Sequence, residues 1–89
     1  MGVDTHKDTH VAVVLDGLGR RLGDLSVPAT PAGYKKLVDW ANEFGPLEHA
    51  GVEGTGCFGA GLARFLKAQE VRVSEVLRPK RRDQYRSGK

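Results

Sequence analysis

The chain lacks several features that would place it in other classes of protein. No apolar stretch approaches the roughly 20 residues that a membrane-spanning helix needs, and no signal-peptide pattern follows Met1. The single cysteine, Cys57, cannot form an internal disulfide and suits a reducing compartment. Internal repeats and low-complexity linkers are absent too. We therefore expect a soluble intracellular protein without a membrane partner, built as one small domain or as part of a larger one.

The charge is distributed unevenly along the chain. The net charge of +3 divides into +5 for residues 72–89 and −2 for residues 1–71. A basic end on a mildly acidic body suits a polyanion lying along one side. A solvated basic end that binds nothing would have the same composition. Composition alone leaves both interpretations open.

The first 16 residues predict two strands around a carboxylate. Asp4 follows an apolar residue, and residues 11–15 are apolar at every position. We predict two antiparallel strands, buried on both faces and joined by a tight polar hairpin. An ionised carboxylate at the end of a central strand is costly to bury without a partner. Asp4 should therefore be paired, hydrated or bound to a metal ion.

The rest of the chain predicts an alternation of strands and helices. A strand over 20–27 with one solvent-exposed face is followed by a helix that begins with Thr30 and Pro31 and ends at Gly45. A buried strand over 50–53, a helix over 57–69 with Phe58 on its apolar face, and a strand over 71–76 come next. The order β-β-β-α-β-α-β is that of the ribonuclease-H-like fold. We predict an α/β domain with a mixed five-stranded sheet over residues 1–77 and a separate basic segment over 78–89.

The predicted topology gives two acids a possible common role. The first and fourth strands lie side by side and parallel in this fold, so the carboxyl ends that carry Asp4 and Glu53 should meet. Two neighbouring carboxylates repel, and a divalent cation relieves that repulsion. Such ions can stabilise the attacking and leaving oxygens in phosphodiester chemistry. A hydrated sheet edge is the alternative.

The other polar residues of the first hairpin are expected to serve the turns. Asp8 and Asp16 are interpreted as solvated turn carboxylates. His6 and His10 would be polar hairpin residues or phosphate contacts beside Lys7, because a strand loses the spacing that would let them share zinc on a helix.

The glycine-rich turn over 54–56 allows a second function. Its backbone N–H groups could cradle a phosphate at a helix start, or form a simple strand-to-helix turn; Cys57 beside it is interpreted as a small helix-start residue rather than a nucleophile. A phosphate role would fit a sugar-kinase or actin-like ATPase half-domain. The first hairpin of such half-domains needs a glycine just after its Asp, and this chain has Thr5 at that position. A non-catalytic nucleic-acid-binding module is a third possibility, and a melting-temperature shift with ATP, or with DNA or RNA, would separate them.

Four segments in order resemble the amino-terminal domain of the DEDD transposases of the insertion sequence 110 family. They are residues 2–12, 28–34, 52–56 and 75–79. The resemblance implies a Holliday-junction-resolvase-like domain whose four acids hold Mg²⁺, with Mn²⁺ as an alternative, followed by a domain with a nucleophilic serine. It also implies DNA and a structured guide RNA as partners, a homo-oligomer for the full-length protein, and a place in the bacterial cytoplasm at the nucleoid.

The resemblance assigns Asp4 and Glu53 as the first two acids, with catalytic and metal-binding roles. The other two acids of the family follow a basic Ser-Gly-Lys stretch, and here residues 85–89 reach only that stretch. The start also has fewer apolar residues before Asp4 than family members usually carry. We therefore expect a truncated transposase fragment that neither cleaves nor recombines DNA alone.

The basic residues are expected to contact nucleic-acid phosphates, with salt-dependent and largely sequence-independent affinity. The candidates are Lys7, Arg78, Lys80, Arg81, Arg82, Arg86 and Lys89. Changing both Arg81 and Arg82 to alanine should flatten the dependence of binding affinity on salt concentration, measured by DNA titrations at several salt concentrations. An unchanged slope would indicate a merely solvated segment.

Overall fold

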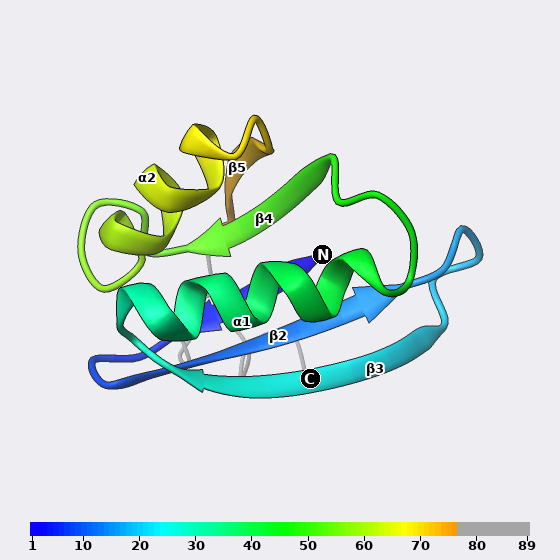
Figure 1. Ribbon diagram of the computed structural model, residues 1–89, viewed down its shortest axis with the longest axis horizontal. Helices are drawn as coiled ribbons and strands as arrows, with labels where there is room; N and C mark the ends of the chain where they lie inside the picture. The colour runs from blue at the N-terminus through cyan, green and yellow to red at the C-terminus, as the bar shows by residue number, and fades with distance from the viewer. Residues whose placement is uncertain (77–89) are drawn as a thin grey trace, which may run out of the picture.

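The structure, a computed structural model, describes residues 1–76 (Figure 1). The elements in this part are strands β1 (Gly2–Thr5), β2 (Thr9–Leu15) and β3 (Arg21–Pro28), helix α1 (Pro31–Asn42), strand β4 (His49–Glu53), helix α2 (Ala60–Ala68) and strand β5 (Arg72–Val76). The α/β class and the order β-β-β-α-β-α-β are therefore confirmed. The predicted basic segment over 78–89 lies outside the described residues.

The five strands form one mixed sheet in the order β3-β2-β1-β4-β5. The β1–β2 and β2–β3 pairs are antiparallel, whereas the β1–β4 and β4–β5 pairs are parallel. Helix α1 carries the chain from the edge strand β3 to β4 on the other side of β1, and α2 connects β4 to β5. The predicted neighbourhood of the first and fourth strands is thus confirmed.

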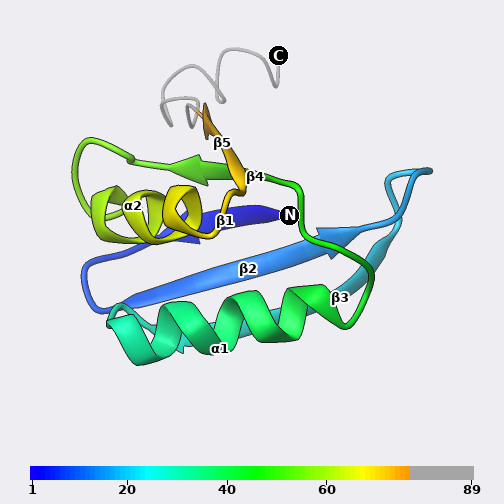
Figure 2. The ribbon, with the colours of Figure 1, turned by 45° about the horizontal axis from the view of Figure 1, so that its top comes forward.

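Both helices lie on the same face of the sheet (Figures 1 and 2). Along β2, His10, Ala12 and Val14 are buried, while Val11 and Val13 between them are only half-buried. The expectation that the first two strands are buried on both faces is wrong for the described residues, because the helices within 1–76 cover one face. Neither of the two helices within residues 1–76 could span a membrane.

Helix α1 begins as the sequence predicts and supplies the centre of the core. The Thr30 hydroxyl accepts a hydrogen bond from the Gly33 N–H at 3.1 Å, and proline occupies the first helical turn. Leu37, Val38 and Ala41 are buried against the sheet. Burying a leucine or valine side chain contributes on the order of 1.5–3 kcal/mol to the free energy of unfolding. The helix is therefore held mainly by its apolar stripe.

Helix α2 starts three residues later than predicted. It begins at Ala60, and the preceding residues form turns instead of a helical stretch from Cys57. Phe58 is 53% exposed and does not lie on the apolar face, which is a correction to the prediction. The buried positions of α2 are Leu62, Ala63 and Leu66. The extra turns before Ala60 follow directly from the six-residue glycine-rich stretch over 54–59.

His10 is a second correction. It belongs to β2 and is fully buried, with its ring stacked on Tyr34 at a centroid distance of 5.9 Å. Neither ring nitrogen hydrogen-bonds to a described residue. It is therefore neither a polar hairpin residue nor a phosphate contact, because the alternation of β2 points it at the helices. Burial lowers the pKa of His10, since the charged ring loses its hydration.

The buried imidazole predicts a loss of stability in mild acid. Above the unfolded pKa of about 6.5, a buried His is neutral in both the folded and the unfolded chain and does not lower the free energy of unfolding. As pH falls below this value and through the lowered folded-state pKa, the unfolded chain binds the proton more readily, and the free energy of unfolding decreases. His10→Phe should keep the ring packing and flatten the fall in unfolding free energy between about pH 7.5 and pH 5. Urea denaturation across this range measures the effect.

The matched control for that experiment is His49→Gln, because His49 is exposed. This variant should keep the fall in unfolding free energy in mild acid, because His10 is still present. Two results would contradict the assignment of the acid-induced loss of stability to His10. One is an unfolding free energy of the unmodified chain that does not change with pH, and the other is a His10→Phe variant whose unfolding free energy falls as steeply as that of the unmodified chain.

Candidate metal and nucleic-acid site

The two acids predicted to meet lie at the carboxyl ends of adjacent parallel strands. Val3 of β1 lies opposite Val52 of β4, so continuing this register by one residue places Asp4 beside Glu53. The Thr5 hydroxyl donates a hydrogen bond to the Glu53 carbonyl at 2.9 Å, which keeps the two backbones together at this end. Neighbouring strands are about 4.8 Å apart. The structure therefore brings the two residues together.

Asp4 and Glu53 also share one face of the sheet. Val3 is 3% exposed and Val52 is fully buried, so both face the helices. Side chains alternate along a strand, and the residues that follow them therefore point to the opposite face. Both acids are half-buried there. Their carboxylates thus occupy the same side of the sheet, as a shared cation would require.

The turn after β1 adds further polar groups to this edge. The His6 Nε2 atom lies 3.4 Å from the Asp4 Oδ1 atom. The His6 N–H donates to the Thr9 carbonyl at 3.0 Å, which closes the turn. Lys7 is exposed in this turn, at the same end of β1 as Asp4. A cationic side chain is therefore exposed at the end of β1 that carries Asp4.

Sequence reasoning missed Glu75 as a residue of this region. It lies on β5, opposite Val52 of β4, and both its carboxylate oxygens accept hydrogen bonds from Thr55. The Thr55 N–H donates at 3.1 Å, and the Thr55 hydroxyl donates to the other oxygen. These bonds, the hydroxyl one first, lower the pKa of Glu75 because they stabilise its charged form. Only the parallel register of β4 and β5 reveals the contact, since the two residues are 20 positions apart.

A hollow of about 320 Å³ opens beside these residues. It is lined by Thr5, Glu53, Gly54, Cys57, Phe58, Glu75 and Val76. Cys57 carries a free, exposed thiol. The hollow is thus an acidic recess at the carboxyl ends of β1, β4 and β5.

The donor chemistry of the acid pair fits a hard divalent cation. Within residues 1–76, no group of three or more His, Cys, Asp or Glu side chains gathers in a metal-binding arrangement. Mg²⁺ commonly binds through only one or two carboxylates and completes its shell with water and substrate phosphates. Asp4 and Glu53 can supply such a pair of oxygen ligands.

The family model for the DEDD transposases of insertion sequence 110, described as a transposase, matches residues 1–89. The chain belongs to this family. A comparison with curated proteins finds no match. Membership of a transposase family implies DNA as a partner and the use of divalent metal ions in general.

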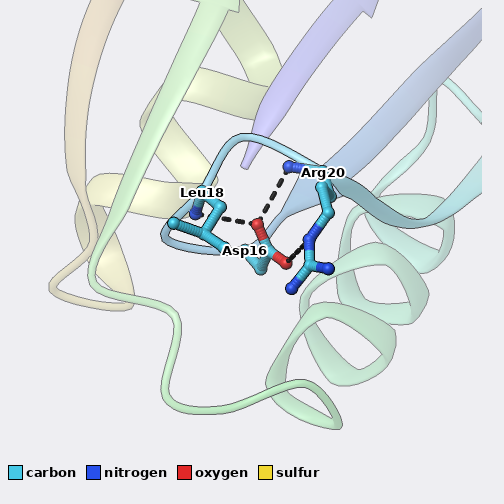
Figure 3. A network of polar contacts seen from close by, with 3 residues as sticks. All are labelled: Asp16, Leu18 and Arg20. Carbon is cyan, nitrogen blue, oxygen red and sulfur yellow. Dashed lines mark hydrogen bonds and ion pairs between the residues drawn. The ribbon is translucent and has the colours of Figure 1, made fainter.

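One of the two acids predicted to serve the turns has a structural role in this transposase chain. Asp16 lies at the far end of β2, where its Oδ1 atom accepts from the N–H groups of Leu18 and Arg20 at 2.8 and 2.9 Å (Figure 3). Its Oδ2 atom accepts from the Arg20 Nε–H at 2.8 Å. These bonds, chiefly that from the Arg20 backbone, lower the pKa of Asp16. Asp16 is therefore a turn carboxylate, as predicted, but it is bound by its own turn and only 21% of its side chain is exposed, so the expectation of a solvated group is wrong.

The close approach of Gly59 to Glu53 predicts a steric test of the site. A Cβ atom at Gly59 would lie 2.5 Å from the Glu53 carbonyl oxygen, a backbone atom that cannot swing away. Gly59→Ala should lower the free energy of unfolding by about 1–3 kcal/mol, the usual cost of overpacking. Gly56→Ala is the control, because nothing lies within 4 Å of its added Cβ. Equal stabilities of the two variants in urea denaturation would contradict this geometry.

Proposed function

We propose that this transposase chain holds Mg²⁺, or Mn²⁺ in its place, between Asp4 and Glu53 and serves metal-dependent phosphodiester chemistry on insertion-element DNA. The observation that supports this most directly is the β1–β4 register, which places the two acids side by side on one face. Repulsion between adjacent carboxylates favours a bound cation. The bound ion would stabilise charge on the oxygens of the reacting phosphate.

We further propose that residues 1–89 alone neither cleave nor recombine DNA. Among these residues, the resemblance assigns Asp4 and Glu53 to two of the family's four acids. Two carboxylates can bind an ion, but two-metal phosphodiester chemistry needs ligands for a pair of ions. The proposed role of Asp4 and Glu53 is therefore to supply two of the ligands of the metal site.

The proposed nucleic-acid contacts begin at the same edge of the sheet. Lys7 is exposed in the turn next to Asp4, where a phosphate approaching the ion would find a positive charge. The other proposed contacts, in the basic segment over 78–89, lie outside the described residues. DNA is the main partner in this proposal. A guide RNA, a homo-oligomer of the full-length protein and a cytoplasmic, nucleoid-associated place in bacteria belong to it as well.

The ATPase alternative is disfavoured by the turn after β4. Phosphate cradling needs N–H groups that are available to the ligand. The N–H and hydroxyl of Thr55 both donate to Glu75 instead. Thr5 also occupies the position after Asp4 at which that class of protein needs glycine. A non-catalytic nucleic-acid-binding module differs from the proposal in having no metal affinity at the acid pair.

The proposal predicts that each of the two acids is needed for metal binding. Asp4→Asn and Glu53→Gln should each weaken Mn²⁺ binding about tenfold or more, because each removes one charged oxygen ligand. Electron paramagnetic resonance of free Mn²⁺ measures the affinity. Asp39→Asn is the control, since Asp39 pairs with Lys35 at 2.9 Å on the exposed side of α1. If either acid variant binds Mn²⁺ as tightly as the control, the proposed site is wrong.

A further inference from the structure

We infer that Glu75 is a positioning residue, whose carboxylate fastens the turn after β4 and thereby holds Glu53 beside Asp4. The inference rests on the proposed metal-binding function of the acid pair. It concerns a residue that neither the sequence motifs nor the resemblance singled out for a role in the site.

The contact between Glu75 and Thr55 has the form of a two-point clamp. Both carboxylate oxygens are used, one for the Thr55 N–H at 3.1 Å and one for the Thr55 hydroxyl. Hydrogen bonds to an ionised acceptor are roughly twice as strong as neutral ones, and two of them fix orientation as well as distance. The clamp therefore ties the turn after β4 to the neighbouring strand β5.

Glu53 and Thr55 are close enough along the chain for a restraint on one to act on the other. The one residue between them is Gly54, which has a φ of +63° in the region that glycine enters without a Cβ penalty. The Gly54 carbonyl accepts from the N–H groups of Cys57 and Gly59 at 2.9 and 2.8 Å, so the turn is closed on its far side. The Glu75 clamp is the contact that links this turn to the sheet at Thr55.

Glu53 is consequently held from both neighbouring strands. On the β1 side, the Thr5 hydroxyl donates to the Glu53 carbonyl at 2.9 Å. On the β5 side, Glu75 holds Thr55, two residues beyond Glu53. The direction of the Glu53 side chain follows from a backbone fixed on either side.

Glu75 is placed to position the site without being a ligand at it. Its register partner is Val52, so its side chain starts on the helix-covered face, whereas Glu53 starts on the other. The hydrogen bonds from Thr55 favour the ionised carboxylate by lowering the pKa of Glu75. The clamp is therefore formed at neutral pH, where both of its acceptor oxygens are available.

The test compares variants that remove the Glu75–Thr55 hydrogen bonds with variants that remove only the negative charge of Glu75. Glu75→Ala removes both, and Thr55→Val removes the hydroxyl donor alone. Glu75→Gln removes the charge but can keep both contacts, because its amide oxygen accepts from the Thr55 N–H while its NH₂ group donates to the hydroxyl. Glu48→Ala is the control, since it removes an equal charge from an exposed position.

Mn²⁺ affinity, measured as for the acid pair, should fall about tenfold in Glu75→Ala, at the low end of the range for residues that orient metal ligands. It should fall by a smaller factor in Thr55→Val and stay near the original in Glu75→Gln and Glu48→Ala. The double variant of Glu75→Ala with Thr55→Val should bind as Glu75→Ala does, because the two residues act through one contact.

Two results would overturn the inference while leaving the proposed function intact. One is an unmodified chain that binds Mn²⁺ and a Glu75→Ala variant that binds it equally well. The other is Glu75→Gln as weak as Glu75→Ala with Thr55→Val unchanged, which would show an effect of charge alone. A chain that binds no Mn²⁺ at all would overturn the proposed function and this inference together.

Amide hydrogen exchange supplies a readout that needs no metal. The Thr55 N–H should exchange faster in Glu75→Ala than in Glu75→Gln, while melting temperatures report on the fold as a whole. Unchanged Thr55 exchange in a folded Glu75→Ala variant would contradict the clamp. Should Glu75→Ala fail to fold, the comparison of Glu75→Gln with Thr55→Val still decides the matter.

Discussion

The parallel pairing of β1 with β4 is the constraint from which the site follows. Val3 and Val52 are opposite each other and both pack beneath the helices. A slip of one residue in either strand would send its acid, Asp4 or Glu53, into the apolar core. An ionised carboxylate without a partner there would cost several kcal/mol. The packing of two valines therefore sets both the register and the relative position of the carboxylates.

Much of the architecture was predictable because local patterns decide it. The Thr30 cap and the apolar stripe of α1 appear where their spacing indicates, and the strand order follows from the succession of elements. The errors arose where a shift of one residue changes which face of a strand or helix a side chain lies on. A run that is apolar at every position did not show that the helices within residues 1–76 cover only one face of β2, nor that His10 points at those helices. The phase of α2 is likewise set by the turns before it, which leave Phe58 in solvent.

The candidate site likewise contains residues that the sequence predicts and a residue that it does not. Asp4 and Glu53 were predictable because each is the first acid after a short apolar strand, and the topology brings such strand ends together. Glu75 was not, because its partner Thr55 is 20 residues away and the contact depends on the pairing of β4 with β5. Periodicity within one segment carries no information about such a contact. The two acids of the candidate site can thus be predicted from sequence, whereas Glu75, the residue proposed to position Glu53, is found only from the structure.

The most direct test is to locate a bound ion on the folded chain. Mn²⁺ broadens the amide resonances of nearby residues in nuclear magnetic resonance spectra. We expect the resonances around Asp4 and Glu53 to broaden together at the lowest Mn²⁺ concentrations, before those around Asp16, whose carboxylate is hydrogen-bonded within its own turn. Broadening at only one of the two strand ends, or first at Asp16, would contradict a single ion held between β1 and β4.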